Sequence, residues 1–417
     1  MIRYGFFGGA PQNTAFSAPI EPLPPPPQVA LAVPARPGVK TGDYVTVGQK
    51  IADPGGGTPG VYAPIAGRVS AIGPRVQGSG ASELSVVVDN DFSDTLSPAV
   101  RPPANPASLP LRQLLTLIQE AGIADGDGSP ILSKIAAGVG RTDTVIICAC
   151  EKEPYMAGNC RLVLERTAEL LEGAGILAKL YGVDRVHIAL GSEQREAIQT
   201  LQDKIRENKS PAVVDAVSLP YPQSAERPLC RAITRRRVPP GAGAAAVGCA
   251  VVDAGAVYAV YEAVYLGRPL THRVVTVAGS GIQQPRNLLC PIGTPIRFLL
   301  DACGGVDPKT YKIVLGGPVT GRAQYDMDAP LGRDDGAVLA FCGDEERASA
   351  HPRCIRCGRC IRACPVGLRP VVMYREMQAG RQTEQLSACI QCGACTYVCP
   401  GRMPLLQAFR GERKERV

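Results

Sequence analysis

The strongest constraint in this chain of 417 residues is a cysteine pattern that occurs twice near its C-terminal end. The pattern Cys-x2-Cys-x2-Cys-x3-Cys-Pro spans residues 354–365 and recurs over residues 389–400. In this spacing, three thiolates bind one iron–sulfur cube, and the fourth thiolate reaches a second cube in the same domain. The pattern therefore predicts two [4Fe–4S] clusters, which pass electrons one at a time.

The spacing also assigns the eight cysteines to the two clusters. The first cluster takes three cysteines of the first repeat and the last cysteine of the second repeat: Cys354, Cys357, Cys360 and Cys399. The second cluster takes the remaining four: Cys389, Cys392, Cys395 and Cys364. A pair of zinc sites is the alternative, but structural zinc sites usually use two Cys-x2-Cys pairs and do not need the Cys-x3-Cys-Pro ending.

The basic excess of the chain is a weak argument for nucleic-acid binding. Lys and Arg outnumber Asp and Glu by 45 to 38, a formal charge of +7. Two clusters, each with four thiolates, would lower this to about +3. No basic stripe with interleaved aromatic residues and no recognition helix accompanies the charge. We therefore expect no nucleic-acid partner.

The sixteen cysteines are expected to be reduced. Residues 1–10 lack the charged and then apolar segments of a signal peptide, and half of the cysteines have metal-ligand spacing, so a reducing cytoplasm is expected. The most apolar stretch, 241–266, contains Asp253 and Glu262. A membrane span needs about 20 predominantly apolar residues. We expect a buried strand and then a helix there, and no direct membrane span.

The first two of four predicted domains differ in composition. Residues 1–105 are rich in Pro, Gly and Val, and the pieces 39–49 and 63–69 resemble the halves of a biotinyl/lipoyl-like barrel-sandwich hybrid domain. The connecting segment 52–58 contains no Lys, so no lysine-borne swinging arm is expected. Residues 106–265 alternate helical and strand patterns, which predict a Rossmann-like α/β domain with parallel strand pairing.

The last two predicted domains complete the chain. Residues 266–340 contain a β-branched strand at 273–277 and a short helix at 295–302, which predict a β-grasp (SLBB-like) domain. Residues 341–417 hold the cysteine repeats and are expected to form an α-helical two-[4Fe–4S] ferredoxin-like domain. The predicted fold class is therefore multidomain α/β.

Further motifs follow one another in a fixed order along the rest of the chain. They are Phe7-Gly8-Gly9, the Pro- and Gly-containing segment Pro34 to Gln49, Glu151-x-Glu153-Pro154-Tyr155, Tyr221-Pro222, Tyr258-Ala259-Val260, Arg273 to Val277, Gly293-Thr294-Pro295 and Gly316-Gly317-Pro318. Together with the cysteine repeats, they resemble the C subunits of Rnf complexes, membrane-associated, ion-pumping machines that couple ferredoxin and NAD. The chain also shares modules with the flavoprotein subunit of respiratory complex I.

The resemblance implies an α/β domain in which NADH delivers a hydride to FMN, and clusters that carry the electrons onward. It implies the other subunits of an Rnf-type complex as partners, with ferredoxin or another redox protein. It also implies a peripheral place on the cytoplasmic face of the cell inner membrane. The cofactor-binding residues to which it points are Gly126, Gly128, Lys134, Glu151 and Glu153. No catalytic side chain is predicted.

The chain departs from the family pattern at four places in the flavin site. Where the family has a run resembling Gly-x-Gly-Gly-Ala-Gly-Phe-Pro, residues 122–130 have fewer glycines and add Asp125 and Asp127, which would repel a pyrophosphate. Cys148 stands where the family has Asn. Ser224-Ala225-Glu226 replaces Gly-x-Glu, and Asp253-Ala254-Gly255-Ala256 replaces an Asn-rich strand end.

Two hypotheses follow from these departures. In the first, the α/β domain binds FMN and NADH through Glu151, Glu153, Lys134 and the remaining glycines. In the second, the domain is a scaffold that docks partners, and the clusters receive electrons from another protein. The loop chemistry slightly favours the second hypothesis. A soluble reductase of the cobalamin-reductase type shares these modules, but it begins with the flavin domain, whereas this chain begins with the barrel.

The other cysteines carry a weaker signal. Cys148, Cys150 and Cys160 lie close together in the sequence and could bind a further metal, but they lack a recognised ligand spacing. Buried free thiols are the favoured interpretation, because free Cys is commonly a small core residue. The remaining cysteines are expected in the core: Cys230, Cys249, Cys290, Cys303 and Cys342.

Overall fold

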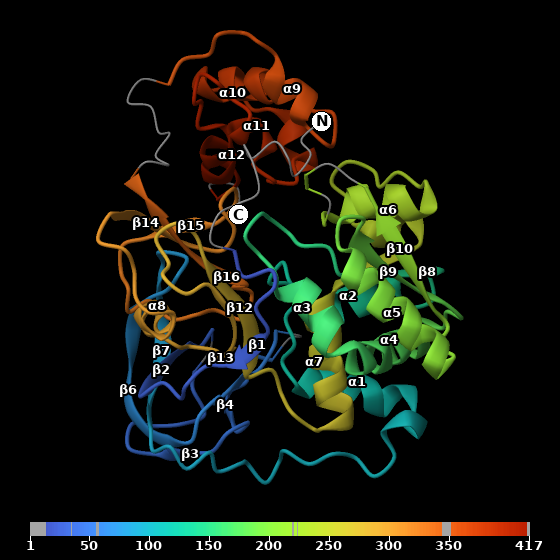
Figure 1. Ribbon diagram of the computed structural model, residues 1–417, viewed down its shortest axis with the longest axis vertical. Helices are drawn as coiled ribbons and strands as arrows, with labels where there is room; N and C mark the ends of the chain where they lie inside the picture. The colour runs from blue at the N-terminus through green and yellow to red at the C-terminus, as the bar shows by residue number, and fades with distance from the viewer. Residues whose placement is uncertain are drawn as a thin grey trace.

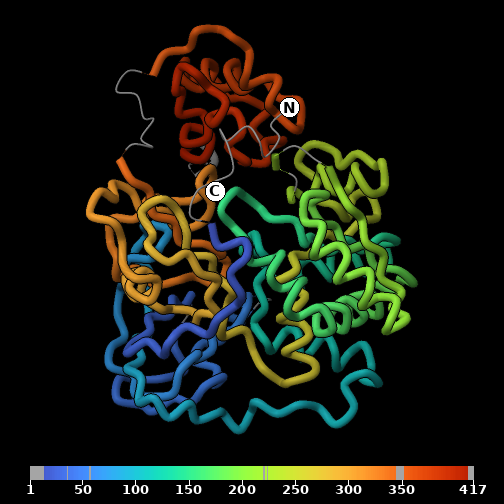
Figure 2. Tube along the Cα trace, in the orientation of Figure 1, coloured from blue at the N-terminus to red at the C-terminus, as the bar shows by residue number. Residues whose placement is uncertain are grey.

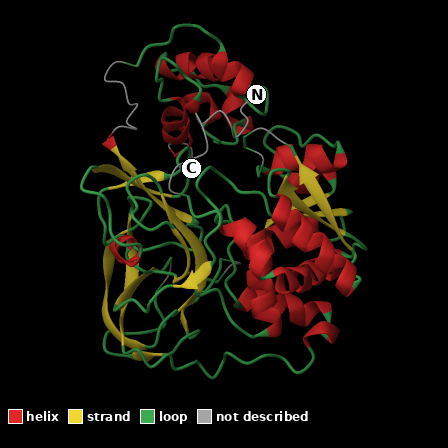
Figure 3. Cartoon of the chain, viewed as in Figure 1, coloured by secondary structure: helices red, strands yellow, loops and turns green. Residues whose placement is uncertain are grey.

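The computed structural model describes residues 14–414 apart from residues 35, 56–57, 219–220, 223 and 344–351. The Phe7-Gly8-Gly9 motif lies outside the described residues. Two β-rich units lie on one side of the molecule and a helix-rich unit on the other, as Figure 3 shows. The C-terminal cysteine domain lies across one end of both (Figure 1).

The N-terminal unit is a barrel-sandwich built from antiparallel strands, of which β6 and β7 are the longest. The strands are β2 (Gln28–Ala32), β3 (Tyr44–Val45), β4 (Lys50–Ala52), β5 (Val61–Tyr62), β6 (Gly67–Val76) and β7 (Ser82–Asn90). One sheet has the order β2-β7-β6-β3, and β4 pairs with β5. Alternate residues of β2 and β7, among them Val29, Leu31, Val86 and Val88, point into the shared core, as the period of two along a strand requires.

The helix-rich unit is a parallel α/β domain. Its strands are β8 (Thr144–Cys148), β9 (Val186–Gly191), β10 (Ala212–Val217) and β11 (Cys249–Asp253), and the sheet order is β10-β9-β8-β11. Its helices are α1 (Leu111–Glu120), α2 (Ile131–Gly138), α3 (Gly158–Glu165), α4 (Thr167–Tyr181), α5 (Arg195–Asn208), α6 (Glu226–Thr234) and α7 (Ala254–Tyr265). The parallel pairing that the sequence predicts is confirmed.

The apolar stretch at residues 241–266 folds as the sequence predicts, into the buried strand β11 followed by the helix α7. Asp253 ends β11 and caps α7, since its side chain accepts a hydrogen bond from the Gly255 amide. No helix in the described part of the chain combines the length and apolarity that a bilayer crossing requires.

The β-grasp unit carries a six-stranded sheet. It contains β12 (His272–Ala278), β13 (Arg286–Pro291), α8 (Ile296–Ala302), β14 (Thr310–Leu315), β15 (Arg322–Gln324) and β16 (Ala337–Cys342). Its sixth strand is β1 (Ile20–Pro22), which comes from the N-terminal segment and pairs in parallel with β13. The chain before the barrel is thus part of the β-grasp sheet, a long-range pairing that local sequence patterns do not reveal.

The C-terminal domain is helical and internally repeated. Its helices are α9 (Arg359–Ala363), α10 (Pro370–Gln378), α11 (Ala394–Tyr397) and α12 (Leu405–Lys414). Residues 35 positions apart correspond, so that α9 matches α11 and α10 matches α12. Met373 of α10 and Phe409 of α12 are fully buried together in its small core. The Cα trace in Figure 2 shows the two halves folded against each other.

A matched pair of glycine substitutions tests the packing of α4 against α7. A methyl group at Gly173 would lie 2.4 Å from the Val257 carbonyl oxygen of α7, whereas one at Gly175 would meet nothing within 4 Å. We expect Gly173→Ala to cost on the order of 1–3 kcal/mol through overpacking. Gly175→Ala should gain up to about 1 kcal/mol of helix propensity. Thermal denaturation followed by circular dichroism should show shifts of opposite sign, and equal shifts would contradict this packing.

Candidate functional site

The four cysteines assigned to the first cluster meet around one cavity. Cys354, Cys357, Cys360 and Cys399 line a cavity of about 200 Å³, which we call site 1. Cys399 belongs to the second repeat, so the chain crosses over to complete the site. Cys357 is exposed, and its neighbour Ile355 is 62% exposed, so site 1 lies at the surface of the domain.

The other four cysteines meet around a second, smaller cavity of about 20 Å³, which we call site 2. They are Cys364, Cys389, Cys392 and Cys395. The structure therefore brings together the same two groups of four that the spacing predicts, although iron binding itself stays a prediction. Apolar residues such as Leu368, Met373 and Phe409 line the rest of site 2.

Backbone geometry repeats at the two sites. Arg356 and Gln391, each just before the second cysteine of a repeat, have positive φ angles of 58° and 53°. Gly358 and Gly393, just after it, have φ angles of 70° and 72°, a conformation that favours glycine. These left-handed turns let the short segment between cysteines wrap around the cavity.

Backbone amides donate to three of the cysteine sulfurs. The Leu368 amide lies 3.3 Å from the Cys364 Sγ, and the Met403 amide, at the matching place in the other repeat, lies 3.5 Å from the Cys399 Sγ. The Gln391 amide lies 3.4 Å from the Cys389 Sγ. Hydrogen bonds to ligand sulfurs help to set the reduction potential of an iron–sulfur cluster.

The donor set fits [4Fe–4S] clusters. Burial raises the pKa of Cys392 and of Cys395 to about 12, so these thiols need a strong positive charge beside them to ionise. Within the described residues, no three His, Cys, Asp or Glu side chains converge closely enough to hold a single metal ion. Eight thiols that surround two cavities suit cubes of iron and sulfide better than single zinc ions.

A larger cavity, of about 450 Å³, lies where the α/β domain, the β-grasp domain and the cysteine domain meet. Cys148 and Asp253 line it from the carboxyl ends of β8 and β11, which pair with each other at these residues. Thr320 lines it from the β-grasp domain, and Cys392 of site 2 lines it from the cysteine domain. Ligands bind to parallel α/β domains at this edge of the sheet. We call this cavity the central pocket.

Carboxylates outnumber cations in the central pocket. Six carboxylates line it: Asp125, Asp127, Glu153, Glu226, Asp253 and Asp334. Three cations line it: Lys134, Lys152 and Arg410. The excess of carboxylates makes the pocket a poor place for a further anion.

The lysines of the pocket are already engaged. Lys134 forms an ion pair with Asp125 and a second one, at 3.1 Å, with Asp127. Burial alone would lower the pKa of Lys134, but the two carboxylates outweigh it and hold the pKa above its ordinary value. Lys152 lies 3.4 Å from an Asp253 carboxylate oxygen and donates to the Gly126 carbonyl at 2.6 Å. Neither lysine is left for a phosphate.

The space beside the glycines of the loop at residues 122–130 is filled by this chain's own side chains. A methyl group at Gly126 would lie 2.1 Å from the Lys152 Nζ, so the glycine makes room for Lys152. Gly128 has a φ of +82° and faces the Asp334 carboxylate. Asp125 also accepts a hydrogen bond of 2.8 Å from the Asp253 amide, which ties the loop to the end of β11.

Glu151 and Glu153 have separate surroundings. Glu153 lines the central pocket and accepts hydrogen bonds from the Val319 amide at 2.6 Å and from Thr320, so it joins the α/β domain to the β-grasp domain. Glu151 is buried and accepts a hydrogen bond of 2.7 Å from the Cys160 amide. Burial raises the pKa of Glu151 to about 7. Of the five predicted cofactor residues, Gly126, Lys134 and Glu153 line the central pocket.

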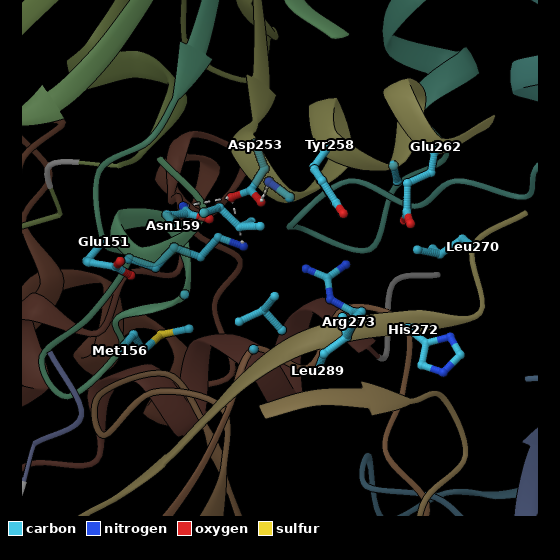
Figure 4. Close-up of a pocket in the computed structure, with 17 residues that line it drawn as sticks. Glu151, Met156, Asn159, Asp253, Tyr258, Glu262, Leu270, His272, Arg273 and Leu289 are labelled. Carbon is cyan, nitrogen blue, oxygen red and sulfur yellow. Dashed lines mark hydrogen bonds and ion pairs between the residues drawn. The ribbon is translucent and has the colours of Figure 1, made fainter. Parts of the chain in front are cut away.

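Glu151 instead lines a second interdomain cavity of about 50 Å³. Figure 4 shows Arg273 of β12 reaching into it toward Tyr258 and Glu262 of α7. Burial raises the pKa of Glu262 to about 7 and lowers that of His272 to about 4, so the imidazole is uncharged near neutral pH. This cavity is too small for a nucleotide.

These residues do not fit the phosphate of FMN or the pyrophosphate of NADH. The volume of the central pocket suits a flavin ring, but both lysines are neutralised by carboxylates. Arg410 donates to the Thr320 carbonyl at 2.9 Å and lies in the field of Glu153. A bound phosphate would have to displace these contacts against the repulsion of the remaining carboxylates.

Contacts between domains were missed by the sequence patterns. The Tyr221 hydroxyl donates to the Cys392 carbonyl at 2.7 Å, and Arg227 of α6 donates to the Ala388 carbonyl at 3.0 Å. Both hold the α/β domain against site 2. The Tyr221-Pro222 motif was the only signal that could have pointed to this interface.

A substitution beside site 1 tests its geometry. A methyl group at Gly401 would lie 1.9 Å from the Arg353 carbonyl oxygen, next to Cys354, whereas one at Gly411 would meet nothing within 4 Å. We expect Gly401→Ala to lose roughly half of the bound iron, because one of two cubes loses its ligand geometry. Gly411→Ala should keep all of it. Iron analysis of the purified variants checks this, and full iron content in Gly401→Ala would contradict the role of the close contact.

Comparisons with known families support the same domains. Family models match the RnfC barrel sandwich hybrid domain at residues 10–93, the Nuo51 FMN-binding domain at 118–262, the SLBB domain at 274–323 and a 4Fe-4S dicluster domain at 349–400. They confirm the predicted multidomain α/β fold class. The NAD+-reducing [NiFe]-hydrogenase, with a TM-score of 0.52 and 16% identity, covers 74% of this chain, which spans 61% of that structure's chain. That likeness concerns the fold alone.

Two relatives cover most of the chain, and both are C subunits of ion-translocating complexes. The relative from the proton-translocating ferredoxin:NAD(+) oxidoreductase complex of Clostridium ljungdahlii is 32% identical over 85% of this chain and 79% of its own length. The relative from the ion-translocating oxidoreductase complex of Rhodobacter capsulatus is 32% identical over 91% of this chain and 75% of its own length. The chain therefore belongs to the RnfC family, the C subunits of Rnf-type ion-translocating oxidoreductase complexes.

Proposed function

We propose that this chain is the electron-transfer subunit of an Rnf-type complex and that its two cluster sites relay electrons between the central pocket and the surface. The observation that carries the proposal is the placement of the two sites. Cys392 of site 2 lines the central pocket, whereas Cys357 of site 1 is exposed. The sites also share one small domain through crossed ligands. Electrons would therefore pass between the interdomain pocket beside site 2 and the exposed face of site 1.

The residues around the two sites suit them to hold clusters and to relay electrons. Bound [4Fe–4S] clusters would supply reversible one-electron transfer. The eight thiolates hold the cubes, and the amides of Leu368, Gln391 and Met403 donate to their sulfurs. The apolar core of Met373, Leu386 and Phe409 excludes water from the space between the sites. The exclusion of water changes the reduction potential of a cluster, and hydrogen bonds to its sulfur ligands change it too.

We further propose that the α/β domain acts as a docking scaffold rather than as an FMN and NADH site. Its paired lysines and excess of carboxylates support this. The second candidate function is electron entry from NADH through FMN. The match to the Nuo51 FMN-binding domain and the nearness of the central pocket to Cys392 favour it.

The proposed setting is the cytoplasmic face of the membrane, with the chain bound peripherally to the other Rnf subunits. The names of the relatives from Clostridium ljungdahlii and Rhodobacter capsulatus, which place them in ion-translocating complexes, support it. Electrons would then be exchanged with a protein partner, for which ferredoxin is one candidate.

Anaerobic absorption spectroscopy of the isolated protein, with iron and flavin quantified, tests the relay. We expect about eight irons per chain, as two cubes require, a broad cluster band that dithionite bleaches, no stoichiometric flavin and no response to NADH. Bound FMN with bleaching by NADH would establish the second candidate instead. Protein reconstituted with iron and sulfide that still held no cluster would refute the relay.

The surface around site 1 suits an acidic redox partner. Residues 352–375 contain six arginines and no Asp or Glu. Arg356, Arg359 and Arg362 are exposed there, beside the exposed apolar side chains of Ile355 and Ile361. An apolar centre within a basic rim is an arrangement that steers an acidic protein to the cluster.

Charge reversal tests this docking surface. The triple variant Arg359→Glu, Arg362→Glu and Arg369→Glu should slow electron exchange with an acidic ferredoxin by roughly tenfold or more at low salt, and the loss should shrink as salt rises. Arg112→Glu, an exposed change on α1 far from the sites, is the control and should have little effect. Stopped-flow absorbance at several salt concentrations measures the rates. Equal rates for the triple variant and the control would exclude docking at this surface.

A further inference from the structure

Two side chains of the α/β domain bind the segment of the second repeat that supplies thiols to site 2. Arg227 of α6 donates to the Ala388 carbonyl at 3.0 Å, and the Tyr221 hydroxyl donates to the Cys392 carbonyl at 2.7 Å. The two donors therefore hold the two ends of residues 388–392. Two of the four thiols of site 2 lie in this short segment.

The internal repeat of the domain offers a comparison within the same chain. The carbonyls of Arg353 and Cys357 lie 35 positions earlier and occupy the matching places at site 1. Both residues are exposed, and in the part of the chain that the structure describes no side chain donates a hydrogen bond to either carbonyl. The contacts from the α/β domain are therefore specific to site 2 and are not a general requirement of the cysteine pattern.

The two donors are held in place by their surroundings. Tyr221 is only 4% exposed and packs with Ala394 and Val319. Arg227 is partly buried, and it forms no ion pair with any described residue. The α/β domain thus places a fixed hydroxyl dipole and a positive charge without a paired carboxylate beside site 2.

The charges of the central pocket oppose the reduction of a cluster at site 2. Cys392 lines this pocket, in which six carboxylates outnumber three cations. Reduction adds a negative charge to a cluster, so nearby carboxylates disfavour it and a nearby cation favours it. Arg227 offsets the field of the carboxylates. The Tyr221 hydroxyl acts in the same direction, because its proton points at a carbonyl oxygen and offsets the partial negative charge there.

We propose that Tyr221 and Arg227 are positioning residues that raise the reduction potential of the cluster at site 2. They act through their charge and dipole and by fixing the segment in which the Gln391 amide lies 3.4 Å from the Cys389 Sγ. Hydrogen bonds to ligand sulfurs are themselves a determinant of cluster potential. The inference rests on the proposed cluster relay. It gives the α/β domain a part in electron transfer that needs no bound flavin.

A redox titration of the cluster-loaded protein, followed by electron paramagnetic resonance, tests the proposal. Dithionite supplies one electron to each cluster, and the two potentials are read from the signals of the reduced clusters. We expect Arg227→Met to shift the sharing of an electron about tenfold away from site 2, which is 59 mV for a one-electron couple. Arg227→Lys, which keeps the charge, should restore most of the potential. Tyr221→Phe should give a smaller shift in the same direction.

Two matched variants serve as controls. Arg231→Met removes an exposed arginine one turn later on α6, and it should move the potential of site 2 much less than Arg227→Met does. Arg375→Met removes an arginine that lines site 1, so it should lower the other potential and thereby assign each potential to its site. Equal shifts in Arg227→Met and Arg231→Met, or no shift in Arg227→Met, would overturn the proposal.

The outcomes also separate this inference from the relay on which it rests. A protein with about eight irons and an unshifted potential at site 2 in Arg227→Met would retain the relay and lose the tuning role. A protein without iron would overturn both. Should Arg227→Met fail to hold its clusters, Tyr221→Phe, which removes a single oxygen atom, decides the question, because an unchanged potential there would overturn the proposal.

Discussion

Each cluster site is completed by a cysteine from the other repeat, and this crossing is the constraint on which the rest of the structure depends. Cys399 closes site 1 and Cys364 closes site 2, so neither half of the domain can hold its four thiols alone. Buried thiols such as Cys392 and Cys395 ionise only beside a strong positive charge. Cluster binding and folding of the domain would therefore be coupled, because the ligands would be brought together and deprotonated in one event.

Hydrogen bonds beside site 2 connect the cysteine domain to the other domains of the chain. Tyr221 and Arg227 of the α/β domain donate to backbone carbonyls at Cys392 and Ala388, and Arg410 of α12 donates to Thr320 of the β-grasp domain. Each of these bonds joins a segment beside the cysteines to another domain: two reach the α/β domain and one reaches the β-grasp domain. The position of site 2 against the central pocket thus depends on these long-range hydrogen bonds together with a small apolar cluster, in which Tyr221 and Val319 pack with Ala394.

Local patterns in the sequence predicted the elements well, because short-range spacing carries that information. The cysteine spacing groups the ligands as the structure does, and the strand–helix unit at 241–266 forms as expected. The pairing of β1 with β13 and the bond from Tyr221 to Cys392 were not predictable in this way. Both join residues more than 150 positions apart, and no periodicity or motif encodes such a contact.

The predicted cofactor residues likewise have some features that a local sequence pattern reveals and some contacts that it does not reveal. The sequence places Asp125 and Asp127 in the loop and predicts repulsion of a phosphate. It does not reveal that Lys134 pairs with both, or that Lys152 fills the space beside Gly126. The carboxylates thus act less by repelling a ligand than by occupying the lysines that would have bound it. Because Asp125 and Asp127 pair with Lys134, this loop forms an internal ion-pair network and offers no free lysine to a phosphate.

Charge then distinguishes the two ends of the relay. The central pocket holds twice as many carboxylates as cations, whereas the surface around site 1 carries arginines and no acidic residue over residues 352–375. An acidic protein would be attracted to site 1 and repelled from the pocket, so it would meet the proposed relay at one end only.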